Sequence, residues 1–194
     1  HRMTPLETRI TVLNDREVRK GRYVLYWMQQ SQRAEYNDAL NVAIREANRA
    51  RLPLVVVFGL TDAYPEANLR HFRFMLEGLQ DVEATLQRRG IRMVLRLSDP
   101  PAVALNLGHD AALIVCDVGY TRHQREWRDK VAREADCQVL QVESDAVVPV
   151  AVVSPTLRLS VSSSSTRLSP VTVSEAVAVS PFVPSKLSVP LPAV

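Results

Sequence analysis

Amide, guanidinium and carboxylate side chains come soon after two strongly apolar runs of this sequence. Gln29, Gln30 and Arg33 follow the first run, and Asp62 follows the second. Side chains of these types hold small ligands by hydrogen bonds and by charge. We therefore take these four residues as candidates for binding a ligand.

The same side chains have an alternative role in holding the fold together. Ser31 fits the N-cap position of a following helix, because its hydroxyl could accept a hydrogen bond from a backbone N–H of the first turn. Arg33 and Asp62 could form salt bridges instead of binding a ligand. The sequence leaves both interpretations open.

The remaining reactive side chains do not form a catalytic or metal-binding pattern. The histidines are isolated from cysteines and acids at metal-ligand spacing, and Glu143 and Asp145 follow the last apolar run, where we interpret them as structural. The two cysteines lie in apolar surroundings without a CxxC spacing, which favours buried free thiols over a disulfide or zinc site. We assign no catalytic residue and no metal.

Apolar runs and amphipathic stretches alternate along residues 21–150. The runs, typical of strands buried on both faces, are 23–27, 54–58, 93–95, 112–116 and 139–142. The stretches with helical spacing are 36–47, 69–86, a short segment from Pro100, and 121 to 135. This order predicts an α/β fold, a Rossmann-like five-stranded parallel sheet with helices on both faces, after an N-terminal extension at 1–20.

A sheet of this kind binds ligands beyond the carboxyl ends of its strands. The candidate residues lie there, but neither GxGxxG nor GxxxxGK[ST] occurs in the sequence. The absence of both motifs argues against most nucleotide-dependent dehydrogenases and against nucleoside triphosphatases.

Residues 151–194 have a different composition from the rest of the chain. They contain six of the twelve prolines and the run 162–165 of four serines, but no glycine or tryptophan. Proline at this frequency opposes helices and central strands. We expect a disordered or loosely extended Ser/Val/Pro-rich tail, and an alternative is that this segment is translated out of frame.

Overall composition points to a protein that works in solution inside the cell. The chain is 46% hydrophobic with a formal charge of +3, and it contains no apolar run of 18 residues and no signal-peptide pattern. We expect an intracellular protein of the cytoplasm or nucleus that does not interact with membranes. Because the chain opens on His1, we also expect a fragment, or a translated stretch whose true start lies upstream or at Met3.

Aromatic residues allow two further interpretations. Tyr26 and Trp27 fall within a predicted strand, so core packing is favoured over electron transfer. Trp127 belongs to a basic run, 122–128, which is either a solvated helix face with an anchoring tryptophan or a surface that meets DNA or another domain.

Five separated blocks of the sequence, in the same order, resemble the amino-terminal half of class II cyclobutane-pyrimidine-dimer photolyases. The resemblance covers roughly residues 8–150, and its blocks are YWMQQSQRAEYN (26–37), LVVVFGLTD (54–62), PEANLRHFRFMLEGL (65–79), DVGYTRHQREWR (117–128) and QVESD (141–145). The family resemblance implies an antenna-type α/β domain over 21–150. It also implies a deazaflavin-type antenna chromophore, with Gln29, Gln30, Arg33 and Asp62 as its possible contacts.

The same resemblance implies a DNA-repair lyase whose chemistry lies elsewhere in the protein. In the family a helical domain holds FAD, the electron-relay tryptophans and the pocket for a pyrimidine dimer flipped out of DNA, which light-driven electron transfer repairs. Residues 151–194 carry none of those helices, so we expect this chain to lack FAD, to meet damaged DNA only through the missing helical domain, and to be inactive alone. Two alternatives are a stand-alone module that binds a chromophore or nucleotide, and a truncated product with no independent role.

Overall fold

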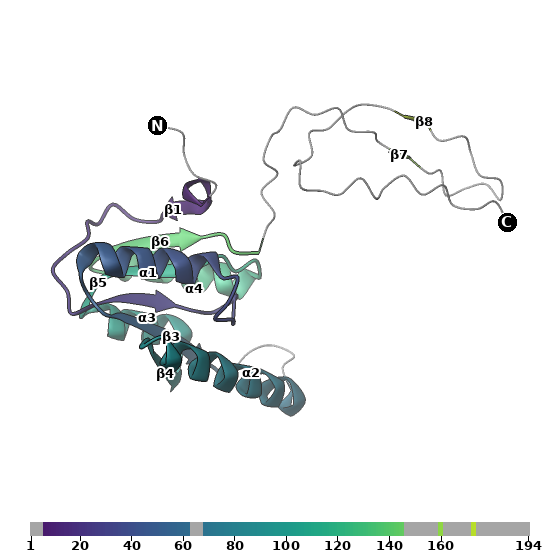
Figure 1. The fold of residues 1–194 in the computed structure, drawn as a ribbon, viewed down its shortest axis with the longest axis horizontal. Coiled ribbons are helices and arrows are strands. Elements are labelled where there is room, and N and C mark those ends of the chain that lie inside the picture. The colour runs from purple at the N-terminus through teal and green to yellow at the C-terminus, as the bar shows by residue number, and fades with distance from the viewer. Residues whose placement is uncertain (1–5, 63–67, 146–158, 161–171, 174–194) are drawn as a thin grey trace. The chain divides into compact units, whose positions relative to one another are not determined.

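A computed structural model of the chain describes residues 6–62 and 68–145 and the residue pairs 159–160 and 172–173 (Figure 1). The chain divides into two compact units, His1–Ala146 and Val147–Val194. In the second unit, strands β7 (Leu159–Ser160) and β8 (Thr172–Val173) pair antiparallel. The predicted disordered or out-of-frame tail otherwise lies outside the described residues.

The first unit contains the predicted parallel sheet, so the α/β fold is confirmed. Its strand order is β1-β6-β5-β2-β3-β4, and β2 to β6 run parallel to one another. These five strands fall on the five apolar runs: β2 Tyr23–Trp27, β3 Leu54–Leu60, β4 Arg92–Leu97, β5 Ala111–Asp117 and β6 Gln138–Val142.

A sixth strand, β1 (Ile10–Val12), was not predicted from the sequence. It follows a short 3-10 helix (Glu7–Arg9) and pairs antiparallel with β6, so that Ile10 is opposite Val142. The strand has three residues and is largely exposed, which leaves no apolar run to mark it. Residues 10–12, interpreted from the sequence as part of an extension, therefore form an edge of the sheet.

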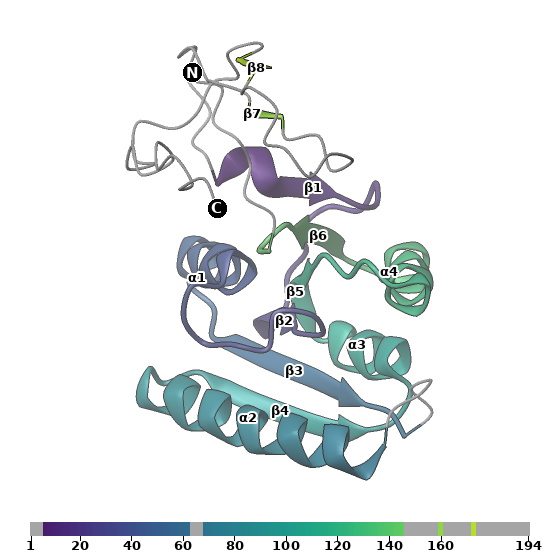
Figure 2. The ribbon, with the colours of Figure 1, turned by 90° about the vertical axis from the view of Figure 1, so that its right-hand side faces the viewer.

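Helices cover both faces of the sheet, as predicted. Helices α1 (Asp38–Ala50) and α2 (Leu69–Arg88) pack on one face, whereas α3 (Pro100–Gly108) and α4 (Arg122–Glu134) pack on the other. Figure 2 shows α1 on the side of the sheet opposite to α3 and α4. Two apolar clusters fill the space between the layers, one around Tyr26 and Leu86 and one around Trp27 and Val131.

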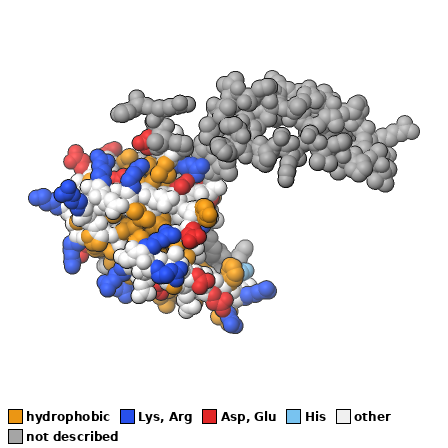
Figure 3. All heavy atoms as spheres, in the orientation of Figure 1, with side chains coloured by type: hydrophobic (Ala, Val, Ile, Leu, Met, Phe, Trp, Pro, Cys, Tyr) orange, Lys and Arg blue, Asp and Glu red, His pale blue; other side chains and the backbone are white. Residues whose placement is uncertain are grey.

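The visible face of the described unit combines charged side chains of both signs with hydrophobic ones. In Figure 3, Lys and Arg side chains are interspersed with Asp and Glu side chains on the visible face. Pairs such as Arg73 with Glu77 and Arg122 with Glu126 lie one helical turn apart. Among the residues described, no helix is both long enough and apolar enough to cross a membrane.

The start of α1 differs from the sequence prediction. Ser31 is not the N-cap, because the helix begins at Asp38 and the Asn37 side chain accepts a hydrogen bond from the Leu40 backbone N–H at 2.9 Å. The Asn37 side-chain amide also donates to the Ser31 and Arg33 carbonyl oxygens at 3.0 and 2.9 Å. Residues 28–37 therefore form a turn whose exit into α1 is fixed by one buried asparagine.

Replacement of Asn37 with alanine is expected to lower the free energy of unfolding by about 2–4 kcal/mol, since it removes a cap and leaves buried polar groups without partners. The matched control is Asn68→Ala, which removes the exposed cap of α2 and should cost about 1 kcal/mol. Urea unfolding followed by circular dichroism measures both. Equal losses would show that Asn37 acts only as a cap.

Candidate functional site

A cavity of about 840 Å³ opens at the carboxyl ends of β2 and β3. The first half of α2 and the start of α4 form its sides, so the cavity borders the sheet and the helix layers on both of its faces. We call it the edge cavity. The side chains and backbone that line it are Gln29, Gln30, Gln32, Phe58, Gly59, Leu60, Thr61, His71, Phe72, Phe74, Met75, Gly78, Gln124 and Trp127.

The lining of the edge cavity is aromatic and amide-rich. Among the described residues that line it there is no lysine, arginine, aspartate or glutamate. Its volume lies in the range of pockets that hold a cofactor-sized molecule, about 300–1,000 Å³. Such a lining favours a flat, largely apolar ligand with a few hydrogen-bonding groups over a highly charged one.

Two of the four predicted ligand-binding residues, Gln29 and Gln30, line the edge cavity. The Gln29 side chain accepts from the Gly59 backbone N–H at 3.1 Å and donates to the Gly59 carbonyl at 3.5 Å, which ties the end of β2 to β3. The Gln30 side-chain carbonyl accepts from the Gln124 amide at 2.8 Å. These contacts hold two amide groups in place along the cavity wall.

The other two predicted residues, Arg33 and Asp62, do not line the edge cavity. The Arg33 guanidinium forms an ion pair with Asp145 at 2.8 Å and donates to the Ser144 carbonyl at 3.1 Å. This ion pair is a salt bridge of the kind that the sequence allowed as the alternative role of Arg33. Asp62 is exposed at the end of the described segment that follows β3.

The buried carboxylate of Asp117, at the end of β5, organises the turn after β2. It accepts hydrogen bonds from the backbone N–H groups of Gln29, Gln30 and Ser31 at 3.2, 3.1 and 2.7 Å. The Tyr26 hydroxyl donates to the same carboxylate at 3.2 Å. Burial raises the pKa of Asp117, and the hydrogen bonds that it accepts act in the opposite direction.

Tyr26 is fully buried between Asp117 and Asn37. Burial, and next the nearby Asp117 carboxylate, raise the pKa of its phenol well above the ordinary value. The folded protein therefore retains this proton at pH values where the unfolded chain has lost it. Stability must fall as pH rises above the unfolded pKa of about 10.

Tyr26→Phe removes that linkage. Between pH 10 and 11 the free energy of unfolding of the unsubstituted protein should fall more steeply than that of Tyr26→Phe, by up to about 1.4 kcal/mol per pH unit. Urea unfolding of both proteins at pH 8, 9, 10 and 11 measures the difference. If the free energies of unfolding of the two proteins change with pH in parallel, the folded state does not retain the Tyr26 phenol proton.

Several residues of the site were not predicted as ligand contacts. Phe72 and Met75 were interpreted as part of the apolar core face of a helix, yet they line the edge cavity together with Phe74, which is 80% exposed. Trp127 also lines the cavity while packing against the cluster around Trp27. The available signal was the density of aromatic residues at the start of α2.

Trp27 has the one buried side-chain donor without a hydrogen-bond partner among the described residues, its indole Nε1. It borders a space of about 10 Å³ beside Cys116 and Trp127. That volume is near the minimum for one water molecule. The predicted burial of Tyr26 and Trp27 in the core is confirmed.

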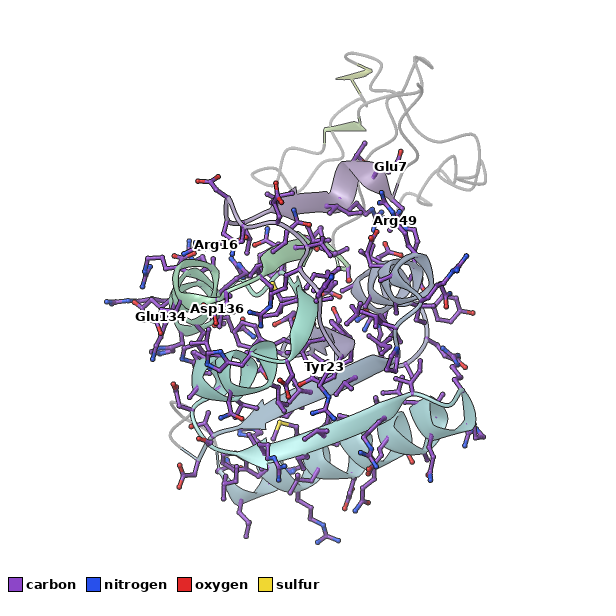
Figure 4. The ribbon with its side chains drawn as sticks, turned by 90° about the vertical axis from the view of Figure 1, so that its left-hand side faces the viewer. Glu7, Arg16, Tyr23, Arg49, Glu134 and Asp136 are labelled. Atoms are coloured by element: carbon purple, nitrogen blue, oxygen red, sulfur yellow. The ribbon has the colours of Figure 1, made fainter. Side chains whose placement is uncertain are left out.

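At the opposite, amino-terminal edge of the strands, polar side chains pair with one another. The His109 Nδ1 lies 3.0 Å from an Asp136 carboxylate oxygen. Figure 4 shows Glu134 and Asp136 close together where α4 ends. Within 6–62 and 68–145 no group of three or more histidine, cysteine or acidic residues could hold a metal ion.

Glu143 and Asp145 have the structural roles expected from the sequence. The Tyr120 hydroxyl donates a hydrogen bond to Glu143, and this contact, with partial burial and nearby carboxylates, raises the pKa of Tyr120 to about 12. The Asp145 backbone N–H is bonded to Glu143 at 2.9 Å, and its carboxylate pairs with Arg33. The two acids thus fix the chain after β6 against neighbouring loops.

The doubly wound sheet, with a cavity at its carboxyl edge, defines a Rossmann-like α/β domain. The sequence model of the DNA photolyase family matches residues 24–160, well over half of the chain. The chain therefore belongs to the DNA photolyase family.

Individual relatives agree with that assignment. A deoxyribodipyrimidine photo-lyase of Methanothermobacter thermautotrophicus is 50% identical over 131 residues, which is 68% of this chain and 29% of the relative. The enzyme of the same name from Potorous tridactylus is 34% identical over 64% of this chain and 24% of its own length. The chain thus spans less than a third of either relative.

A solved photolyase shows the same fold. The archaeal photolyase from Sulfolobus tokodaii, whose structure contains two FAD molecules, superposes with a TM-score of 0.56 at 17% identity. The superposition covers 65% of this chain and 30% of that protein. The likeness supports the α/β architecture.

Proposed function

We propose that this chain is the antenna-type α/β domain of a class II cyclobutane-pyrimidine-dimer photolyase, and that its edge cavity binds a deazaflavin-type chromophore. The observation that carries the proposal is the cavity itself: about 840 Å³, at the carboxyl edge of the sheet, lined by aromatic and amide side chains. Family membership supports a photolyase context for that cavity.

The cavity lining suits a flat heteroaromatic ring. Phe72, Phe58 and Trp127 supply apolar faces and edges against which a ring system can pack, and Gln29 and Gln30 place amide groups beside them. When bound, such a chromophore would supply light absorption and pass its excitation energy to the flavin. The chain's own residues bind the ring, orient it and keep water from it.

The cavity fits FAD less well than a ring without phosphates. A diphosphate group requires cations or free backbone N–H groups. The described lining has no lysine or arginine, and the N–H groups after β2 are already bonded to Asp117. We therefore place FAD, the flipped pyrimidine dimer and the light-driven repair step on a helical domain beyond this α/β domain.

The test is equilibrium binding of 5-deazariboflavin to the purified chain in the dark. Trp127 lines the cavity and Trp27 lies beside it, and they are the only tryptophans in the chain, so binding should quench tryptophan fluorescence. We expect saturable quenching and a matching shift in the chromophore spectrum. A linear, non-saturating response would contradict the proposal.

A second measurement tests whether the chain alone repairs DNA or retains FAD. The chain is incubated with FAD and with DNA that contains a thymine dimer, under blue light. We expect no repair and no stoichiometric retention of FAD, because the proposed catalytic domain lies elsewhere. Binding of adenosine monophosphate in place of 5-deazariboflavin would favour a stand-alone nucleotide-binding module.

A further inference from the structure

Asp117 lies at the topological switch point of the sheet. Strand β2 is central, and the chain proceeds from it to β3 and β4 on one side and then crosses to β5 and β6 on the other. Asp117 ends β5, directly beside the turn that follows β2. In doubly wound folds the crevice at this point is where a ligand phosphate binds to backbone N–H groups.

Three consecutive N–H groups point at that position in this chain. The backbone donors of Gln29, Gln30 and Ser31 form a concave arrangement of the type that binds anions, which we call the 29–31 nest. Asp117 fills the nest with a carboxylate from its own strand. The residue is 4% exposed, so solvent does not compete for these bonds.

We propose that Asp117 is a positioning residue: its carboxylate takes the place of a ligand phosphate in the 29–31 nest, and in doing so it holds Gln29 and Gln30 against the edge cavity. The chain's own anion makes the turn after β2 rigid before any ligand arrives. It also closes the switch point to phosphate, so that the cavity selects ligands that place no phosphate there. The selectivity rests on the proposed chromophore binding, whereas the positioning does not.

The packing of the turn supports this assignment. Gln29 is bonded to Gly59 and Gln30 to Gln124, so a shift of the nest would move both contacts with the cavity wall. Outside the nest, the Tyr26 hydroxyl donates to Asp117, and the Asn37 side-chain amide donates in turn to the Tyr26 hydroxyl and the Ser31 carbonyl. One carboxylate thus connects the end of β5, the end of β2 and the start of α1.

The experiment is chemical rescue of the full chain by small anions. Asp117→Ala empties the nest, and it should lower the thermal midpoint and weaken 5-deazariboflavin binding by about tenfold or more. Sodium formate, or inorganic phosphate, should partly restore both the thermal midpoint and the 5-deazariboflavin affinity of Asp117→Ala, and the effect should saturate. Sodium chloride at equal ionic strength should not. The unsubstituted protein should gain no comparable stability from formate.

Asp117→Asn is the matched control, because it keeps the nest filled while replacing one accepting oxygen with a donor. The affinity of Asp117→Asn for 5-deazariboflavin should fall about as much as that of Asp117→Ala, but formate should not restore it. If Asp117→Ala does not fold at any formate concentration, Asp117→Asn decides: affinity reduced about tenfold supports positioning, and unchanged affinity overturns it. Equal rescue by chloride and formate would also overturn the proposal.

The outcomes separate this inference from the proposed function. If 5-deazariboflavin does not bind the unsubstituted protein but formate stabilises Asp117→Ala, the cavity ligand is wrong and the nest assignment stands. If the chromophore binds the unsubstituted protein and Asp117→Ala equally well, the positioning role is wrong and the cavity ligand stands.

Discussion

Replacement of Gly21 with alanine is expected to lower the free energy of unfolding by about 3 kcal/mol or more, a large fraction of the stability of a domain this size. A Cβ atom at Gly21 would lie 2.2 Å from the Ala112 backbone nitrogen and 2.5 Å from the Ala111 carbonyl carbon. These contacts are with backbone, so no side-chain rotation can relieve them.

The surroundings of Gly21 cannot move away without breaking the sheet. Ala111 and Ala112 begin β5, which is buried along its whole length between β2 and β6. The Arg19 N–H donates to the Ala112 carbonyl at 3.1 Å, and the Arg22 N–H donates to the Asp110 carbonyl at 2.7 Å. A displaced chain would therefore lose hydrogen bonds on both sides of Gly21.

Gly78→Ala is the matched control for the same chemical change. Gly78 lies within α2, where an added Cβ meets nothing within 4 Å. Because glycine is a poor helix former, this substitution should raise stability by about 0.5–1 kcal/mol. Urea unfolding of both variants measures the contrast, and a loss of under about 1 kcal/mol at Gly21 would show that the backbone adapts.

The sequence predicted the central sheet and the four helices because their signals are local and strong. The run of 112–116 is apolar at every position, as expected of β5 with both faces covered. The stretch of 69–86 keeps its apolar residues on one face over five turns, a spacing typical of a helix. Strand β1 has three half-exposed or exposed residues, and only its pairing with β6 makes it a strand.

The candidate site was predicted less completely, because position along the chain does not determine where a side chain points. Gln29 and Gln30 follow β2 at once, so the strand itself carries them to the cavity. Arg33 comes three residues later, after the turn has reversed, and it reaches Asp145 instead. Contacts of this kind join residues more than 100 positions apart, and no local pattern encodes them.

Asp117 shows what a local pattern could still have indicated. A carboxylate at the end of a fully apolar strand must find donors, since burying an unpaired charge costs several kcal/mol. The nearest donors in a doubly wound fold are the N–H groups after the adjacent strand, β2. The absence of GxGxxG is consistent with this arrangement, because a nest filled by the chain itself does not need glycines to admit a phosphate.

Replacement of Gly78 with tryptophan is expected to reduce 5-deazariboflavin binding by at least about tenfold while leaving the fold intact. Gly78 lines the edge cavity from α2, and open space surrounds the position of its missing Cβ. An indole ring at position 78 would take up part of the edge cavity that Gly78 lines. Equilibrium dialysis measures the affinity without relying on tryptophan fluorescence, which the substitution alters.

Two controls make the result specific to the cavity. Gly78→Ala leaves most of the volume free and should bind as the unsubstituted protein does. Gln80→Trp places the same ring on an exposed position of α2 that does not line the cavity, and it should also bind normally. If Gly78→Trp unfolds in urea like Gly78→Ala yet binds 5-deazariboflavin undiminished, the chromophore lies elsewhere, and the edge cavity is not its site.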